Sequence, residues 1–234
     1  MNTQLSSSRP YFRDKNLIPT LDSGDRLTQK EFHRRYEAMP EHVRAELING
    51  VVYMASPVRT EYHGRPHAAM MAFLGYYRVA TDGVDLLDNA SYIASDDYEP
   101  QPDCVLRVKE ECGGKSWVNN EDYLEGSPEM IVEIASSSVS FDLREKFELY
   151  ERKGVSEYIV WRVLDEQIDW FALENGKYKK FTANEHGIVE SKVFPGLELN
   201  VPAMLEGELK TVFADLQTGL ASKKYLDFVK KLAK

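Results

Sequence analysis

The sequence predicts an α/β fold, because it combines a strand–helix–strand unit with two β-hairpins. In the unit, apolar strands at 130–134 and 158–163 flank a helix that is expected to begin at Asp142 and to end before Gly154. A connection of this kind usually joins parallel strands. The hairpins are indicated by an Asn-Gly pair at 49–50, between apolar runs, and by a second at 175–176, between segments 167–173 and 177–181, since Asn-Gly is typical of two-residue hairpin turns.

The other elements follow from capping, turn and periodicity signals. Thr28 and Glu31 form a capping box for a helix that runs to about residue 38, and Pro66 suits the first turn of the next helix. Asp142 and Glu145 form a second capping box at the start of the central helix. Further helices are expected at 68–79, 212–220 and 224–232, strands at 84–87, 91–94, 102–108 and 188–194, and a long loop at 111–125.

Length and composition favour one domain. The chain has 234 residues, of which 43% are hydrophobic and 29% charged, as in an ordinary globular protein with a sizeable core. We expect a mobile N-terminal arm at 1–24, a folded domain at 25–207 and a helical C-terminal tail at 208–234. The sequence shows no internal repeat and no low-complexity linker, which again favours a single domain.

Several classes of protein are disfavoured by the composition. No apolar run reaches the roughly 20 residues of a membrane-spanning helix, and the polar N-terminus does not resemble a secretory signal, so we expect no membrane partner and a cytoplasmic location. Cys104 and Cys112 match no zinc spacing. The net charge of −9 argues against a broad electrostatic footprint for nucleic acid, but not against a carboxylate cluster that binds cations.

Three polar residues of the central region suggest chemistry. Glu133 interrupts an otherwise buried strand, where a carboxylate is costly unless it is paired or bound to a metal. Asp103 opens another strand, and Lys146 lies one helical turn after Asp142. The structural alternatives are a turn at Asp103 and an Asp142–Lys146 pair worth about 0.3 kcal/mol. Together, two carboxylates on neighbouring strands suit Mg²⁺, and a nearby lysine suits hydrolysis of a phosphodiester.

Other polar residues are ambiguous on their own. Glu46 lies on the first arm of the N-terminal hairpin, where an exposed edge-strand carboxylate is the favoured interpretation. His63 and His67 are four residues apart near a helix start, but the glutamate of the zinc-protease motif is missing between them. Capping or packing is therefore the favoured role for both histidines.

The sequence resembles the Uma family of endonucleases, within the PD-(D/E)XK, or restriction-endonuclease-like, superfamily. The resemblance extends over roughly residues 28–205 and depends on ELINGVVYMASP followed by His63, on PDCV, on FPGLEL and above all on VEIASSSVSFDLREKFELYERKGVSEYIVWRV. It implies a restriction-endonuclease-like core over 25–207, in which helices flank a mixed β-sheet and β-hairpins form extensions.

The resemblance also implies a set of site residues. Asp103 and Glu133 match the acidic metal ligands, the main-chain carbonyl of Ile134 would be a further ligand, and Glu46 would be an additional metal or water ligand. The superfamily lysine normally stands two residues after the second acid, where this chain has alanine; Lys146 takes its place from the following helix. The cofactor implied is Mg²⁺, with Mn²⁺ as a substitute.

Two departures from the family pattern concern the surroundings of the site. Ser136-Ser137 stands where the family often has Ser-Pro, and Trp161-Arg162 stands where an aspartate often follows the strand. Neither departure removes one of the expected ligands.

Three functions remain open at this point. The first is a Mg²⁺-dependent DNA endonuclease, with Arg144, Arg152 and Lys153 available for phosphate contacts and a homodimer expected by analogy, because duplex cleavage needs two sites. The second is a catalytically silent binding or regulatory module of the same fold. The third is a carboxylate-pair glycosidase, which would need no lysine. For the nuclease, Glu133→Ala is expected to leave folding intact, because it removes a buried charge that only a metal compensates.

Overall fold

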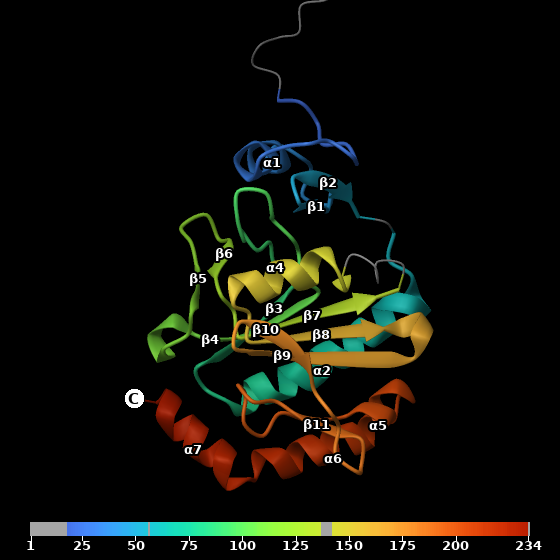
Figure 1. Ribbon diagram of the computed structural model, residues 1–234, viewed down its shortest axis with the longest axis vertical. Helices are drawn as coiled ribbons and strands as arrows, with labels where there is room; N and C mark the ends of the chain where they lie inside the picture. The colour runs from blue at the N-terminus through green and yellow to red at the C-terminus, as the bar shows by residue number, and fades with distance from the viewer. Residues whose placement is uncertain (1–17, 56, 137–141, 234) are drawn as a thin grey trace, which may run out of the picture.

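A six-stranded mixed β-sheet forms the centre of the computed structural model, which describes residues 18–55, 57–136 and 142–233 (Figure 1). The strand order is β10-β9-β8-β7-β4-β3; β7 and β8 are parallel and the other neighbours antiparallel. The strands are β3 (Val84–Asp88), β4 (Cys104–Val108), β7 (Met130–Ala135), β8 (Glu157–Arg162), β9 (Gln167–Glu174) and β10 (Lys177–Lys180). The mixed sheet and the parallel central pair are as predicted.

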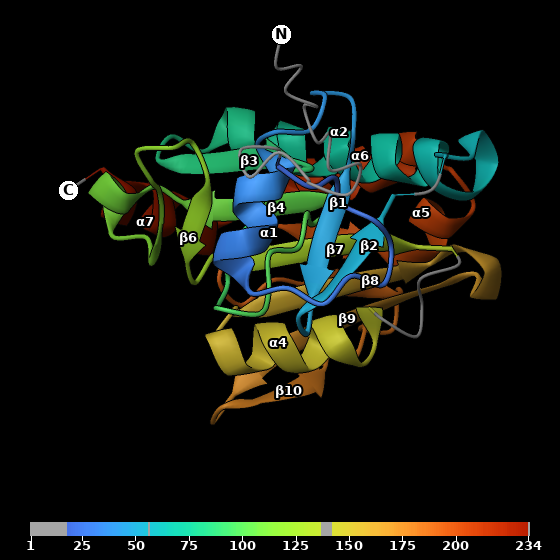
Figure 2. The same cartoon turned by 90° about the horizontal axis from the view of Figure 1, so that it is seen from above.

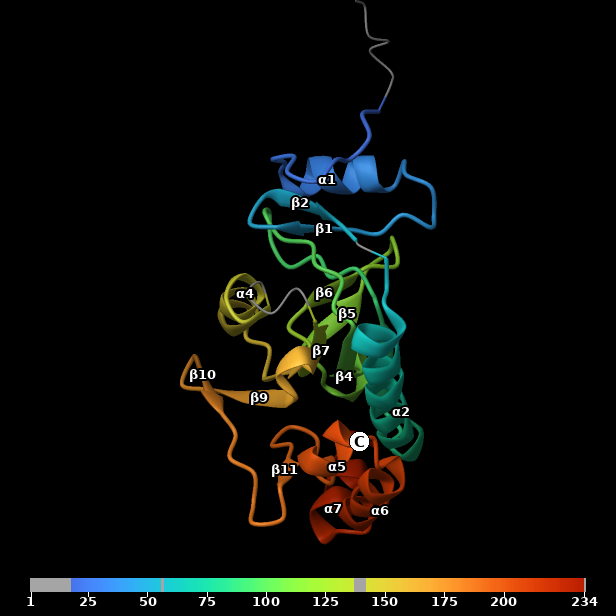
Figure 3. The same cartoon turned by 90° about the vertical axis from the view of Figure 1, so that its right-hand side faces the viewer.

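Helices cover both faces of the sheet (Figure 3). Helix α4 (Glu145–Lys153) packs on one face, and α2 (Arg65–Ala80) covers the other together with α5 (Val201–Leu205), α6 (Leu209–Leu220) and α7 (Lys223–Leu232). Side chains alternate along a strand, so Val132 and Ile134 of β7 join the core on the α2 side, whereas Ile131 faces α4. Glu133 therefore points to the α4 side.

The N-terminal elements lie over the face of the sheet that carries α4 (Figures 1 and 2). They are α1 (Gln29–Tyr36), β1 (Ala45–Ile48) and β2 (Val51–Met54). Asn49 and Gly50 both have positive φ, 52° and 70°, as a type I′ hairpin turn requires. The main chains of Leu47 and Glu99 exchange two hydrogen bonds of 3.1 and 2.9 Å, and these bonds attach the hairpin to the loop before β4.

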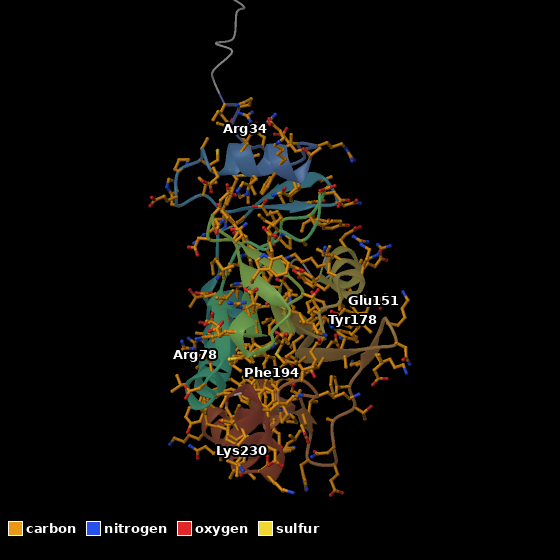
Figure 4. All side chains as sticks on the ribbon, turned by 90° about the vertical axis from the view of Figure 1, so that its left-hand side faces the viewer. Arg34, Arg78, Glu151, Tyr178, Phe194 and Lys230 are labelled. Atoms are coloured by element: carbon orange, nitrogen blue, oxygen red, sulfur yellow. The ribbon has the colours of Figure 1, made fainter. Side chains whose placement is uncertain are left out.

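The ends of the chain contribute to the core in the part that the structure describes. Leu21 is buried against the N-terminal hairpin, whereas residues 1–17 of the expected arm lie outside the described ranges. Val212 and Leu216 of α6 are buried in the main cluster beside α2, with Phe194 between the sheet and these helices (Figure 4). Within the described ranges, no helix combines the length and apolar character needed to cross a membrane.

The edge strand β10 is fastened to α4. Tyr178 lies beside Glu151 of α4 (Figure 4), and its main-chain N–H donates to Glu151 Oε2 at 2.7 Å. The Tyr178 hydroxyl donates to the carbonyl of Val155, 2.9 Å away, just after the helix ends at Gly154. These bonds fix the position of α4 on the sheet, and α4 carries one of the predicted site residues.

Some predictions of secondary structure were wrong. Helix α4 begins at Glu145, three residues later than expected, and Arg144 precedes it without a side-chain cap. The loop expected at 111–125 contains a short helix, η2 (Glu110–Cys112), and a hairpin of β5 (Ser116–Val118) and β6 (Leu124–Gly126). Residues 91–94 form an isolated bridge instead of a strand. The strand expected at 188–194 ends early as β11 (Ile188–Glu190), which pairs with β12 (Glu198–Asn200).

Candidate active site

All five of the predicted site residues line one pocket. The pocket has a volume of about 770 Å³ and lies where the β1–β2 hairpin approaches β4, β7 and α4. The contributing residues are Glu46 of β1, Asp103 next to β4, Glu133 and Ile134 of β7, and Lys146 of α4. Four separate segments of the chain therefore meet at this end of the sheet.

Lys146 is the centre of an ionic cluster. Its Nζ lies 3.0 Å from Glu133 Oε1, 3.0 Å from Glu46 Oε1 and 3.6 Å from Asp142 Oδ1. The expected pair with Asp142 is present, but it is one of three. Glu46 faces the pocket with only 26% of its side chain exposed, so its interpretation as a solvated edge carboxylate was wrong. A hydrogen bond of 2.7 Å from the Gln101 N–H holds the same Glu46 oxygen in place.

The pKa values of Glu133 and Lys146 are both raised, but for different reasons. Burial raises the pKa of Glu133 well above its usual value; Lys146 opposes this, and the nearby acids add to it. Burial lowers the pKa of Lys146, but Glu133, Glu46 and Asp142 together raise it well above its usual value. Three carboxylates thus surround one protonated lysine. The expectation that only a metal compensates the Glu133 charge was wrong, because Lys146 is paired with it and Tyr150 donates to it at 3.0 Å.

Asp103 and Ile134 are joined by direct contacts. The Ile134 N–H donates to Asp103 Oδ2 at 2.6 Å, which ties the start of β4 to β7. His63 lies against both residues: its Nε2 is 3.2 Å from Asp103 Oδ1, and its Nδ1 is 3.2 Å from the Ile134 carbonyl oxygen. Each ring nitrogen faces an acceptor, so only the protonated imidazolium donates to both. The hydrogen bond to Asp103 raises the pKa of His63, with burial opposing it.

His67 has a different environment from His63. Its Nε2 lies 3.1 Å from the main-chain oxygen of Asp103 and 3.2 Å from Asp88 Oδ1. It therefore holds the chain at the mouth of β4, which is the structural role favoured from the sequence. The two imidazole rings stack with 5.6 Å between their centres, so His67 helps to hold the His63 ring in place.

Sequence reasoning missed one contributor to the site, Tyr150, and the contacts of a second, His63. Tyr150 follows Lys146 by four residues, so both lie on one face of α4; this spacing could have identified it. His63 was noted, but nothing local indicated that it would contact Asp103 and Ile134. The cations expected to bind phosphates, Arg144, Arg152 and Lys153, do not line the pocket.

The donor set fits a hard cation. Among the residues that the structure describes, no three His, Cys, Asp or Glu side chains converge in the way a protein-only metal cage requires. Mg²⁺ does not need such a cage, since it usually takes one or two carboxylates and keeps several waters. The carboxylates of Asp103 and Glu133 and the carbonyl of Ile134 are oxygen donors of this type. His63 contacts two of these donors, with its Nε2 3.2 Å from Asp103 Oδ1 and its Nδ1 3.2 Å from the Ile134 carbonyl oxygen.

The fold and the site together have the features of a nuclease-like α/β domain. The family model described as "Uma2: Putative restriction endonuclease" matches residues 30–202. The chain belongs to this family. A crystal structure described as "a putative nuclease belonging to DUF820", from Anabaena variabilis ATCC 29413, resembles it with a TM-score of 0.53 and 10% sequence identity, covering 78% of this chain and 97% of that one. A search of curated proteins finds no match.

Proposed function

We propose that the protein is a metal-dependent endonuclease that hydrolyses phosphodiester bonds of DNA. The observation that carries the proposal is the convergence of Asp103, Glu133, Lys146 and Glu46 in one pocket, from four segments of the chain. Membership of a family described as restriction endonucleases supports the reaction class and the substrate. The expected homodimer, cytoplasmic location and division into arm, domain and tail stay predictions.

Each site residue has a distinct role in the proposed reaction. Asp103, Glu133 and the Ile134 carbonyl would hold Mg²⁺, or Mn²⁺ in its place. The cation supplies charge neutralisation at the phosphodiester and a more acidic bound water. Lys146, kept protonated by its carboxylate neighbours, is a compact positive charge that can orient the attacking water or stabilise the developing negative charge. Glu46 lies 3.0 Å from Lys146 Nζ and helps to fix its position.

The proposal is tested by cleavage of DNA with Mg²⁺ or Mn²⁺, and with EDTA as the metal-free control. Asp103→Asn keeps an acceptor for the Ile134 N–H but removes the charge that would bind the cation, so cleavage should fall by about a hundredfold, since loss of even a group that supports a metal ligand typically costs about 10–100-fold. The matched control is Asp227→Asn, at an exposed aspartate of α7 that does not line the pocket. Cleavage that persists in EDTA, or that is equally reduced in both variants, contradicts the proposal.

The alternative of a catalytically silent module has one observation in its favour. The pair of Lys146 with Glu133 already compensates that charge without a metal, at a distance of 3.0 Å. Titration calorimetry with Mg²⁺ and Mn²⁺ separates the two functions, because a module without chemistry has no need of a cation at Asp103. Heat of binding that disappears in Asp103→Asn supports the enzyme, and absence of binding in the wild type supports the module.

A further inference from the structure

The rim of the pocket carries two arginines that its ionic cluster does not use. Arg44 lies just before β1 and Arg59 just before the π-helical turn η1 (Thr60–Gly64); both line the pocket and both are exposed. Within the described ranges, neither is within ion-pair distance of a carboxylate, whereas Lys146 at the floor has three. The floor is acidic and repels a phosphate, so these two guanidiniums are the attractive charges that a polyanion meets at the entrance.

An exposed apolar surface lies beside the arginines. Val58, Tyr62 of η1 and Leu164 of η3 (Val163–Asp165) line the same pocket, and they expose 71%, 45% and 62% of their surface. The elements η1 and η3 are in contact, so Tyr62 and Leu164 lie on neighbouring parts of the pocket lining. An exposed tyrosine between aliphatic side chains and unpaired arginines has the composition of a single-strand site, in which bases stack on an aromatic ring and cations follow the backbone.

The same features disfavour a duplex. The volume of about 770 Å³ falls in the range of sites that enclose one small ligand, roughly 300–1,000 Å³. A duplex also needs a broad basic face. The net charge is −9, and the lysines of edge strand β10, Lys177, Lys179 and Lys180, are each paired with a carboxylate. The mouth of the pocket combines two arginines that form no ion pair within the described ranges with the exposed ring of Tyr62.

We propose that this pocket takes an unpaired stretch of nucleic acid, with a base stacked on Tyr62 and backbone phosphates bound by Arg44 and Arg59. The inference rests on the proposed nuclease function and names its substrate class: a single strand, a flap or a frayed end, and not an intact duplex. A single strand crosses one site, so the reaction on this substrate needs only one protomer.

Binding of fluorescein-labelled oligothymidylate is compared with binding of its duplex with oligodeoxyadenylate, by anisotropy with Ca²⁺ in place of Mg²⁺. The single strand should bind at least about tenfold more tightly. Arg44→Ala and Arg59→Ala should each weaken single-strand binding several-fold and lower its salt dependence by about one counterion. The matched control is Arg78→Ala, since Arg78 is exposed on α2 away from the pocket (Figure 4). Equal or tighter binding of the duplex, or an equal loss in the control, overturns the inference.

The stacking role is tested separately at Tyr62. Tyr62→Ala should weaken binding of oligothymidylate about fivefold or more, the range found for loss of a base–aromatic stack, and Tyr62→Trp should keep it. Trp117→Ala, at an exposed aromatic of β5 outside the pocket, is the control. If Tyr62→Ala has no effect, or if Tyr62→Trp is as weak as Tyr62→Ala, stacking is refuted. A parallel binding measurement with oligouridylate shows whether the protein prefers RNA or DNA as the single strand.

The same oligonucleotides, incubated with Mg²⁺ and resolved on gels, separate failure of the inference from failure of the nuclease function. Cleavage of the duplex with no preference for the single strand keeps the nuclease and refutes the inference. Single-strand binding that depends on Tyr62 and Arg59, without cleavage in any metal, keeps the inference and refutes the nuclease.

Discussion

Replacing Lys146 should destabilise the protein far more than replacing any one of its acidic partners. Lys146→Met keeps much of the aliphatic volume of the side chain but leaves Glu133, Glu46 and Asp142 without their shared cation. The side chains of Lys146, Glu133 and Asp142 are only 7%, 5% and 2% exposed, so solvent screens little of the repulsion. Breaking a buried pair by removing one partner typically costs about 3–5 kcal/mol.

Removing the charge of Glu133 should cost less than removing that of Lys146. Glu133→Gln leaves Lys146 with Glu46 at 3.0 Å and Asp142 at 3.6 Å, so no charge is stranded. The expected cost is about 1–2 kcal/mol, the value of a charge-assisted hydrogen bond. The double variant should cost less than the sum of the two, because removing Glu133 relieves part of the repulsion that Lys146→Met creates.

The assay is urea unfolding of the wild type and the three variants in EDTA, with the free energy of unfolding taken from linear extrapolation. EDTA excludes a contribution from bound metal. A loss below about 1 kcal/mol for Lys146→Met, well under the cost expected for a stranded buried charge, would falsify the argument. So would an equal loss for Lys146→Met and Glu133→Gln, since the reasoning depends on the excess of carboxylates over cations.

Two further predictions concern stability outside the site. Burial raises the pKa of Glu157 from 4.5 to about 7. The folded state therefore binds the proton more tightly than the unfolded state does. As the pH rises from about 4.5 to about 7, the free energy of unfolding should fall by on the order of 3 kcal/mol. Glu157→Gln should flatten this slope in urea unfolding across pH, and an unchanged slope refutes the assignment. Gly219→Ala places a Cβ 2.3 Å from the Gly196 carbonyl oxygen and should lower the free energy of unfolding by more than about 2 kcal/mol. Gly176→Ala, at a φ of 77° with open space around it, should lower it by about 1 kcal/mol. Similar urea midpoints for the two variants would contradict this.

The elements that could be predicted from sequence are those with local causes. Asn49-Gly50 favours the positive φ angles of a type I′ turn, and Gly154 ends α4 in the left-handed conformation with φ of 79°. The start of α4 could not be predicted in the same way. Asp142 is a good capping residue by local rules, but α4 begins at Glu145, and the Asp142 side chain lies 3.6 Å from Lys146 Nζ, which also binds Glu46 and Glu133 from distant segments. The β5–β6 hairpin was missed because its strands are only three residues long.

The sequence by itself determined which residues would need partners. Glu133 in an apolar strand and Asp103 at the mouth of another are costly to bury alone, and this can be judged from residue type and pattern. Only the tertiary structure decided which partners they have. Docking of the β1–β2 hairpin through Leu47 and Glu99 places Glu46 against Lys146, and the turn before α2 places His63 between Asp103 and Ile134. The physical reason is that a buried charge is satisfied by whichever group packing brings near, and packing depends on contacts far apart in the chain.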